Sequence, residues 1–250
     1  MQTYRSTIWF FKGLNHFTKG GYEKAAKTFK TEETDMTNKT VVITGGNSGL
    51  GKQTAITLSN KGAKVYIVCR SKERGEEAVK EIKNGKVYVM DLSLPKSVSD
   101  FVSVFEKEVG QCDVLVFCFN LKINNAGCMV NEKKMTEDGI DVNFATNTLG
   151  TFYLTQKMLP LLKKSKDARV ITVSSGGMYV QKMTSETDFN DKNYDGTMIY
   201  AKNKRQQVEL THHWANENPS IKFFSMHPGN LFLFRLGRHS GCAFEYATVL

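Results

Sequence analysis

Residues 40–51 read TVVITGGNSGLG, which joins a run of β-branched residues to a glycine-rich turn and the start of a helix. The run Thr40–Thr44 has the composition of a short buried strand. In the turn, Gly45 can make the tight bend, Gly49 lets the backbone approach a pyrophosphate, and Gly51 lets the helix lie near the strand. N–H groups at the helix start would then face the anion. The stretch predicts a nucleotide site, although a tight turn without a ligand has the same pattern.

Strand and helix patterns alternate along the chain on the C-terminal side of this turn. Short β-rich runs recur, and the segments between them have helical spacing, which is typical of βαβ units. The sequence therefore predicts an α/β fold, a single domain built on a Rossmann-type, doubly wound parallel sheet. The expected strands are 40–44, 64–69, 86–90, 113–116, 169–173 and 221–226, and the expected helices are 52–60, 98–109, about 139–164, and 200–218, the last stopped by Pro219.

Two residues at strand ends bear on the kind of nucleotide. An NAD site would normally place Asp or Glu after the second strand to hold the ribose hydroxyls, but this chain has Arg70 there. A guanidinium can bind a ribose 2′-phosphate with fork geometry, so the sequence favours NADP(H) over NAD(H). The alternative is an ordinary solvated cation. Asp91, after the third strand, could accept from the adenine amino group or only cap a turn.

Tyr200 and Lys204 are four residues apart in YAKNK, so their side chains share one face of the predicted helix. The reference pKa of tyrosine is about 10, which makes a poor acid or base at neutral pH. A neighbouring ammonium favours the phenolate and lowers that pKa. Lys204 could do this while reaching the nicotinamide ribose. The alternative is a core tyrosine beside a surface lysine.

Ser175 and Asn147 are further candidates for the chemical end of the site. Ser175 closes the run RVITVSS, and the carboxyl edge of a parallel sheet faces the ligand crevice. Its hydroxyl could bind a substrate carbonyl near Tyr200, or Ser174 and Ser175 could simply end a strand and cap a turn. Asn147 is unfavourable inside a long helix. Its amide could hold a water near Lys204, or it could be an ordinary surface residue.

The order of these pieces, with NNAG at 124–127 and HPG at 227–229, resembles the short-chain dehydrogenase/reductase family over about residues 39–229. The resemblance implies a catalytic tetrad of Asn147, Ser175, Tyr200 and Lys204. NADPH would deliver hydride to a carbonyl carbon while Tyr200 supplies the proton, and the reverse reaction would oxidise an alcohol. Neighbouring branches of the family often act on lipophilic carbonyls. The cofactor contacts that the resemblance implies are Gly45, Asn47, Ser48, Gly49, Leu50, Gly51, Arg70, Asp91, Leu92, Asn125, Ala126, Gly127, Tyr200, Lys204, Pro228 and Gly229.

The chain departs from the family pattern in two places. Residues 117–122, FCFNLK, separate the fourth strand from NNAG. We expect DVLVFCF to form the strand and NLKI to bulge, because the other register would bury Lys122 at a cost of several kcal/mol. After Gly229 the family adds a strand and a helix, for which residues 230–250 are too few. The predicted organisation is an extension at 1–38, the domain at 39–229 and an atypical tail at 230–250.

Composition limits the partners and the compartment. The net charge is +9, but the lysines are dispersed, so nucleic acid is not expected. The five cysteines lack metal-ligand spacing, and neither a metal site nor a disulfide framework is expected, which suits a reducing cytoplasm. No apolar run approaches the roughly 18 residues of a membrane span. Residues 1–30 mix aromatic and basic side chains, which fits either contact with a membrane surface or a helix packed on the domain.

Two functions from different classes follow. The first is an NADP(H)-dependent oxidoreductase that acts on a lipophilic carbonyl or alcohol with tyrosine as acid and base. The second is a non-catalytic protein that keeps the fold and binds a cofactor or a partner, its activity impaired by the 117–122 insertion and the altered C-terminus. Nucleotide-sugar epimerases also use this Tyr and Lys spacing but need a longer C-terminal region. The sequence names neither the substrate nor the reaction direction, and it leaves a homodimer open.

Overall fold

The structure is a computed structural model that describes residues 18–28, 34–118, 129–184 and 194–228, together with Thr7 and Gly13. Several predictions made above fall outside these ranges. They concern the inserted residues from 119 onward, most of the aromatic N-terminal segment and the tail. The predicted site residues outside the described ranges are Asn125, Ala126, Gly127 and Gly229.

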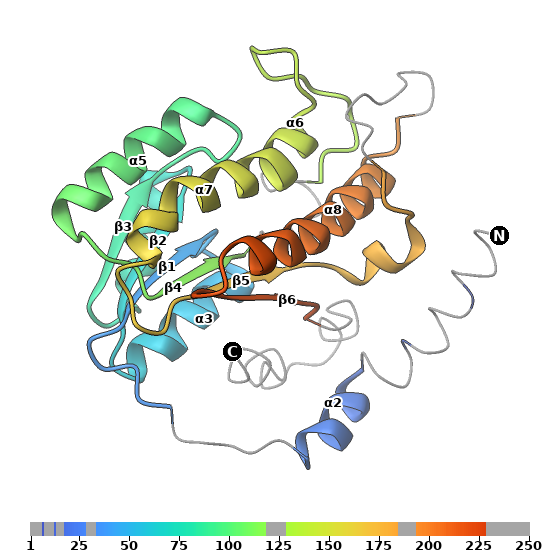
Figure 1. The fold of residues 1–250 in the computed structure, drawn as a ribbon. Helices are drawn as coiled ribbons and strands as arrows, with labels where there is room; N and C mark the ends of the chain where they lie inside the picture. The colour runs from blue at the N-terminus through green and yellow to red at the C-terminus, as the bar shows by residue number, and fades with distance from the viewer. Residues whose placement is uncertain are drawn as a thin grey trace.

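Six parallel strands form one sheet in the order β3-β2-β1-β4-β5-β6, which confirms the predicted Rossmann-type fold (Figure 1). Every neighbouring pair is parallel. The order reverses between β1 and β4, and ligands of such sheets bind at that reversal, beyond the carboxyl ends of the strands. The strands are β1 (Thr40–Thr44), β2 (Lys64–Cys69), β3 (Gly85–Val89), β4 (Val114–Phe117), β5 (Arg169–Val173) and β6 (Lys222–Met226).

Helices cover both faces of the sheet (Figure 1). Apolar residues of α3 and α4 pack on one face, and those of α5 and α7 pack on the other. On the second face, Trp214 of α8 stacks between Phe152 of α7 and Phe223 of β6, with both ring centroids 6.1 Å away. The helical elements are α2 (Lys19–Ala26), α3 (Gly49–Asn60), α4 (Lys72–Val79), α5 (Pro95–Glu108), α6 (Val142–Phe144), the π-helical turn η1 (Ala145–Leu149), α7 (Gly150–Leu162), the 3₁₀ turn η2 (Gly176–Val180) and α8 (Gly196–Glu217).

Despite the inserted residues that follow it, β4 is formed by Val114–Phe117, as in the register that the sequence favoured. Val114–Phe117 pair with Val41–Thr44 of β1 and with Arg169–Thr172 of β5, and all four β4 residues are buried. Because these apolar residues occupy the strand positions, the alternative register that would place Lys122 in the core is wrong. Interior parallel strands need such continuous apolar runs.

The helix expected at about 139–164 is wrong in its first residues. Gly139 has a left-handed backbone with φ 72°, and the helix begins only at Val142. Asp141 caps it, since its Oδ1 accepts from Phe144 N at 3.0 Å. The helix then widens into the π-turn η1 before α7 continues.

The helix expected at 200–218 begins four residues earlier than predicted. Asp195 caps α8, because its Oδ1 accepts from the backbone N–H groups of Thr197 and Met198. Gly196 permits this start: a Cβ there would lie 2.1 Å from Val130 O. Tyr200 therefore lies in the second turn of α8 and not at its first residue.

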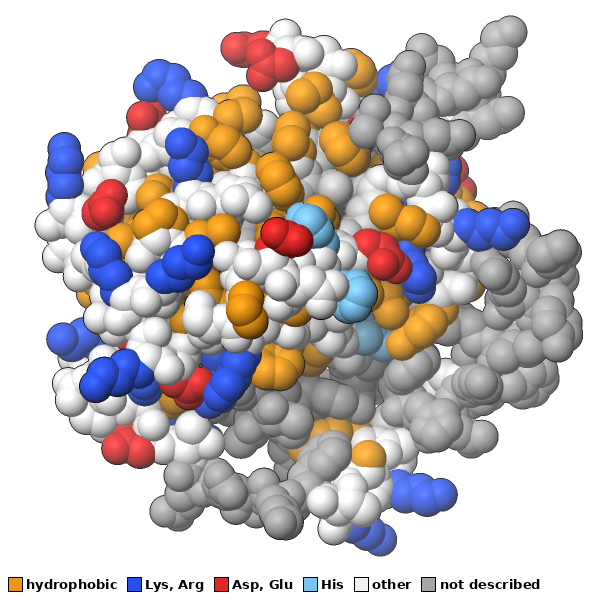
Figure 2. Space-filling view, in the orientation of Figure 1, with side chains coloured by type: hydrophobic (Ala, Val, Ile, Leu, Met, Phe, Trp, Pro, Cys, Tyr) orange, Lys and Arg blue, Asp and Glu red, His pale blue; other side chains and the backbone are white. Residues whose placement is uncertain are grey.

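The surface of the described residues mixes charged and apolar side chains (Figure 2). On the face shown in Figure 2, cationic side chains are dispersed among acidic and apolar ones. His212 and His213 are exposed on α8. Within the described ranges, no helix combines the length and the apolar character needed to cross a bilayer.

Candidate active site

The glycine-rich turn lies where the strand order reverses. Gly45 has φ 63° and its N–H donates to Val68 O at 2.8 Å, and Gly49 has φ 57°, so both adopt the left-handed backbone that glycine favours. Gly51 brings α3 close to the turn. A Cβ at that position would lie 2.5 Å from Gly45 O and 3.2 Å from the Cβ of Cys118, which follows β4.

The start of α3 fits an anionic ligand. Ser48 precedes the helix with an extended backbone, and its side chain makes no capping hydrogen bond to the helix N–H groups. Ser71 and Asp195, by contrast, cap α4 and α8 with their side chains. Helix N–H groups and the positive end of the helix dipole favour a phosphate. The turn therefore has the backbone and the open helix start that a dinucleotide pyrophosphate needs.

The two strand-end candidates differ in what they contact. Arg70 is exposed after β2, and its guanidinium forms no hydrogen bond or ion pair with the described residues. Asp91 Oδ1 accepts from Ser93 N at 2.9 Å and from Ser93 Oγ at 2.6 Å, so this carboxylate does cap a turn. Leu92 is buried, and its carbonyl approaches Gly150 so closely that a Cβ there would lie 2.1 Å away.

Tyr200 and Lys204 share the buried face of α8. Lys204 Nζ lies 5.4 Å from the centroid of the Tyr200 ring. Tyr200 is 6% exposed and Lys204 is 1% exposed, so the alternative of a core tyrosine beside a surface lysine is wrong. The ammonium donates to Val173 O at 2.8 Å and to Gln207 Oε1 at 3.0 Å. Lys204 is thus held at the carboxyl end of β5.

Asn147 lies in the π-turn and is 0% exposed, so its interpretation as a surface residue is wrong. Its backbone carbonyl accepts from Gln207 Nε2 and, at 2.7 Å, from Thr151 Oγ1. Gln207 therefore joins the backbone of Asn147 to the ammonium of Lys204. Sequence reasoning missed Gln207, although it lies one turn after Lys204 on the same helix face.

Ser175 lies two residues beyond the end of β5 and begins the turn η2, where its Oγ accepts from Gly177 N at 3.3 Å. The hydroxyl retains its own proton as a donor. Ser174 Oγ donates to Lys204 O at 3.0 Å, which ties the end of β5 to α8. Pro228 is buried two residues after β6.

The segment after Ser175 runs along the first turns of α8. Gln181 Nε2 lies 3.3 Å from Met198 Sδ, and Gln206 Nε2 donates to Thr184 O at 3.1 Å. This segment exposes large apolar side chains: Tyr179 is 45% exposed and Met183 is 51% exposed. Apolar surface therefore gathers on the segment that follows the candidate serine.

A second polar cluster, also missed from the sequence, holds the start of the helix that contains Asn147. Tyr194 donates its hydroxyl to Asp141 Oδ2 at 2.8 Å and accepts from Asn143 Nδ2 at 2.7 Å. Asn143 also exchanges two hydrogen bonds with the backbone of Val130, both 2.9 Å long. Burial, followed by the bond to Asp141, raises the pKa of Tyr194, which keeps it a neutral donor. We call Asp141, Asn143 and Tyr194 the loop clamp.

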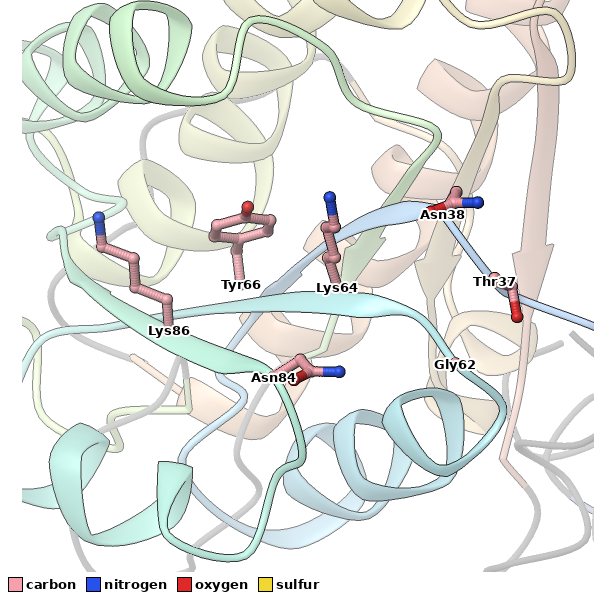
Figure 3. Close-up of a pocket in the computed structure, with 7 residues that line it drawn as sticks. All are labelled: Thr37, Asn38, Gly62, Lys64, Tyr66, Asn84 and Lys86. Atoms are coloured by element: carbon pink, nitrogen blue, oxygen red, sulfur yellow. The ribbon is translucent and has the colours of Figure 1, made fainter.

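A cavity of about 500 Å³ lies at the amino-terminal ends of β1, β2 and β3, whereas the glycine-rich turn follows the carboxyl end of β1. Figure 3 shows the residues that line the cavity. Lys64, the first residue of β2, lines it, together with Tyr66 and Lys86. Ligands of doubly wound sheets bind at the carboxyl ends of the strands. This cavity is therefore separate from the candidate active site.

The arrangement of turn, strand ends and buried tyrosine–lysine pair defines a dinucleotide-dependent oxidoreductase fold, and the comparisons with known proteins agree. A family model described as short chain dehydrogenase matches residues 39–187. The chain belongs to the short-chain dehydrogenase family, whose members are oxidoreductases that use a nicotinamide cofactor.

Among its relatives is dehydrogenase/reductase SDR family member 12. The Bos taurus protein is 48% identical over 238 residues, which cover 92% of this chain and 73% of the relative, and the Homo sapiens protein is 47% identical. Retinol dehydrogenase 12 from Bos taurus is 37% identical over 216 residues, covering 83% of this chain and 66% of the relative.

Solved structures share the fold. A crystal structure of an uncharacterised protein from Mycobacterium paratuberculosis has a TM-score of 0.66 at 30% identity and covers 86% of this chain and 74% of that chain. The structure of 3-ketoacyl-(acyl-carrier-protein) reductase from Brucella melitensis complexed with NADH has a TM-score of 0.60 at 24% identity, with coverages of 77% and 75%.

Proposed function

We propose that the protein is an NADP(H)-dependent oxidoreductase that interconverts a lipophilic carbonyl and its alcohol, with Tyr200 as the acid and base. The observation that carries the proposal is the buried ammonium of Lys204, which lies 5.4 Å from the centroid of the Tyr200 ring. A positive charge beside a phenol stabilises the phenolate, which brings the proton transfer nearer to neutral pH.

The residues that would hold the cofactor are the glycine-rich turn and Arg70. The turn offers the backbone N–H groups at the start of α3, and the exposed guanidinium of Arg70 is suited to a 2′-phosphate. Where NAD sites place a carboxylate that would repel this phosphate, the chain has Arg70 after Cys69. When bound, the nicotinamide donates or accepts the hydride.

The chain's own residues would handle the proton and the substrate oxygen. In the reductive direction, the Tyr200 hydroxyl gives its proton to the carbonyl oxygen, and the phenolate left behind is stabilised by Lys204. The Ser175 hydroxyl donates a hydrogen bond to the same oxygen and orients the substrate. In the oxidative direction, the Tyr200 phenolate takes the proton from the alcohol.

Exposed apolar side chains support a lipophilic substrate. Tyr179 and Met183 lie on the segment that follows Ser175, and contacts of Gln181 and Thr184 hold that segment along α8. Apolar surface beside a polar reaction centre binds hydrocarbon and leaves the carbonyl to the hydrogen-bond donors. The name of one relative, retinol dehydrogenase 12, fits this substrate class.

The experiment compares binding and turnover in the chain and in Tyr200→Phe. We expect NADPH fluorescence to be enhanced by both proteins, and a panel of aldehydes and ketones that includes retinal to be reduced only by the unchanged chain. Tyr153→Phe is the matched control, because the Tyr153 hydroxyl bonds Ser99 of α5 at 2.9 Å and not the crevice. Turnover that survives Tyr200→Phe would rule out the proposed acid. Enhanced fluorescence with no turnover of any substrate would favour a non-catalytic cofactor-binding protein instead.

A further inference from the structure

Gln207 is a buried amide whose two polar atoms both bond groups of the candidate site. It is 0% exposed on α8. Its Oε1 accepts from Lys204 Nζ at 3.0 Å, and its Nε2 donates to Asn147 O and, at 3.2 Å, to Thr151 Oγ1. A buried amide is tolerated when its donors and acceptor are satisfied in this way.

The chemistry of the partners fixes the orientation of this amide. An ammonium can only donate and a backbone carbonyl can only accept, so the oxygen must face Lys204 and the nitrogen must face Asn147. Neither a carboxylate nor an apolar side chain could make both contacts. Thr211 Oγ1 adds a bond to Gln207 O at 2.7 Å, which ties this turn of α8 to its next turn.

Val173 and Gln207 offer Lys204 two neutral acceptors, which matters for the charge of the ammonium. The Val173 carbonyl and the Gln207 amide oxygen solvate the ammonium without cancelling it. Among the described residues, titratable groups that face this charge include Tyr200 on the same helix and Cys118 after β4. Burial raises the pKa of the Cys118 thiol to about 12, while the charge of Lys204 acts in the opposite direction. The thiol is therefore neutral and leaves the lysine charge to act on Tyr200.

We infer that Gln207 is a positioning residue of the proposed reaction: its amide holds the Lys204 ammonium beside Tyr200 and fastens it to the backbone of Asn147. The hydrogen bonds from Gln207 to Asn147, and from Lys204 to Gln207 and Val173, join α8 to the π-turn and to the end of β5. The inference rests on the proposed function, since it assigns to Gln207 the support of the proposed acid.

The test measures the Tyr200 phenol itself, without substrate or cofactor. The chain is labelled with [ζ-¹³C]tyrosine, and the Tyr200 resonance, one of nine, is identified by its loss in Tyr200→Phe. Two variants are titrated beside the unchanged chain. Gln207→Glu places a carboxylate against the ammonium, and Gln207→Met removes the acceptor while keeping a side chain of similar length. Both should weaken the positive charge at Tyr200 and raise its measured pKa by about one unit.

Gln206→Glu is the matched control. Gln206 is 5% exposed on the same helix, and its amide also joins α8 to the π-turn through Thr148 Oγ1 at 2.8 Å, but it bonds Thr184 instead of Lys204. Its replacement should reduce the melting temperature and leave the Tyr200 titration in place. If Gln207 had only a structural role, its variants would likewise lower the melting temperature and leave the Tyr200 pKa unchanged.

The possible results separate the two proposals. A lowered Tyr200 pKa in the unchanged chain that rises in either folded Gln207 variant, but not in Gln206→Glu, supports the inference. A lowered pKa that stays the same in every folded Gln207 variant, or that rises equally in the control, overturns the inference and leaves the proposed function standing. A Tyr200 that titrates near the ordinary value of about 10 in the unchanged chain overturns both.

Discussion

Single side chains on α8, in the π-turn and after β5 carry most of the chemistry that the sequence predicts. The spacing of Tyr200 and Lys204 places their side chains on one helix face, because four residues make about one helical turn, but a core tyrosine beside a surface lysine has the same spacing. Their catalytic role was predicted from the resemblance to the short-chain dehydrogenase/reductase family. Gln207 was not found, since a glutamine in a polar helix gives no sign that its face is buried. The fold decides that point: Gln207, Lys204 and Asn147 are all fully buried or nearly so between α8 and the π-turn.

Arg70 should decide the choice between the two nicotinamide cofactors. A guanidinium with a phosphate contributes about 1.5–3 kcal/mol, so Arg70→Ala should weaken NADPH binding by about 10-fold to 100-fold. NADH has no 2′-phosphate and its binding should change little. Fluorescence titrations with both cofactors provide the measurement. Arg74→Ala, an exposed arginine on the following helix, is the control and should alter neither affinity.

At the scale of helices and strands, local sequence predicted the strands better than the helix ends. All six strand ranges expected from the sequence differ from the observed ones by no more than one residue at either end, because buried parallel strands have continuous apolar runs that end abruptly. The start of α8 was missed because it depends on the Asp195 cap and on the close approach of Gly196 to Val130. That approach joins residues far apart in sequence, so no local pattern shows it.

The loop clamp should contribute measurably to the stability of the segment that carries Asn147. Tyr194→Phe removes one hydroxyl that bonds both Asp141 and Asn143, two residues that are 3% and 0% exposed. Buried polar groups that lose a partner cost about 1–3 kcal/mol, so the free energy of unfolding should fall by that amount. Urea unfolding provides the measurement.

The control for this prediction is Tyr66→Phe. The Tyr66 ring packs edge-on against Phe105, with centroids 5.3 Å apart, and its hydroxyl bonds none of the described residues. Its replacement should therefore change the free energy of unfolding by much less. An equal loss in the two variants would mean that the clamp adds nothing beyond the general cost of removing a tyrosine hydroxyl.

For the molecule as a whole, stability should depend on pH through His227, which follows the last described strand. Burial lowers the pKa of this imidazole from 6.5 to about 4, so the folded protein keeps it neutral. The unfolded chain binds a proton below about pH 6.5 and the folded chain does so only near pH 4. The contribution is therefore fully present above about pH 6.5 and is lost as pH falls through this window.

The expected loss between pH 7 and pH 5 is about 2 kcal/mol in the free energy of unfolding, measured by urea unfolding at each pH. This window lies above the titration of Asp167, whose pKa is lowered to about 2 by hydrogen bonds from Lys222 and then Arg169. His227→Gln has no proton to gain, so its stability should be nearly flat over the same range. A variant that loses as much stability as the unchanged chain would place the responsible group elsewhere and would mean that His227 is solvated in the folded protein.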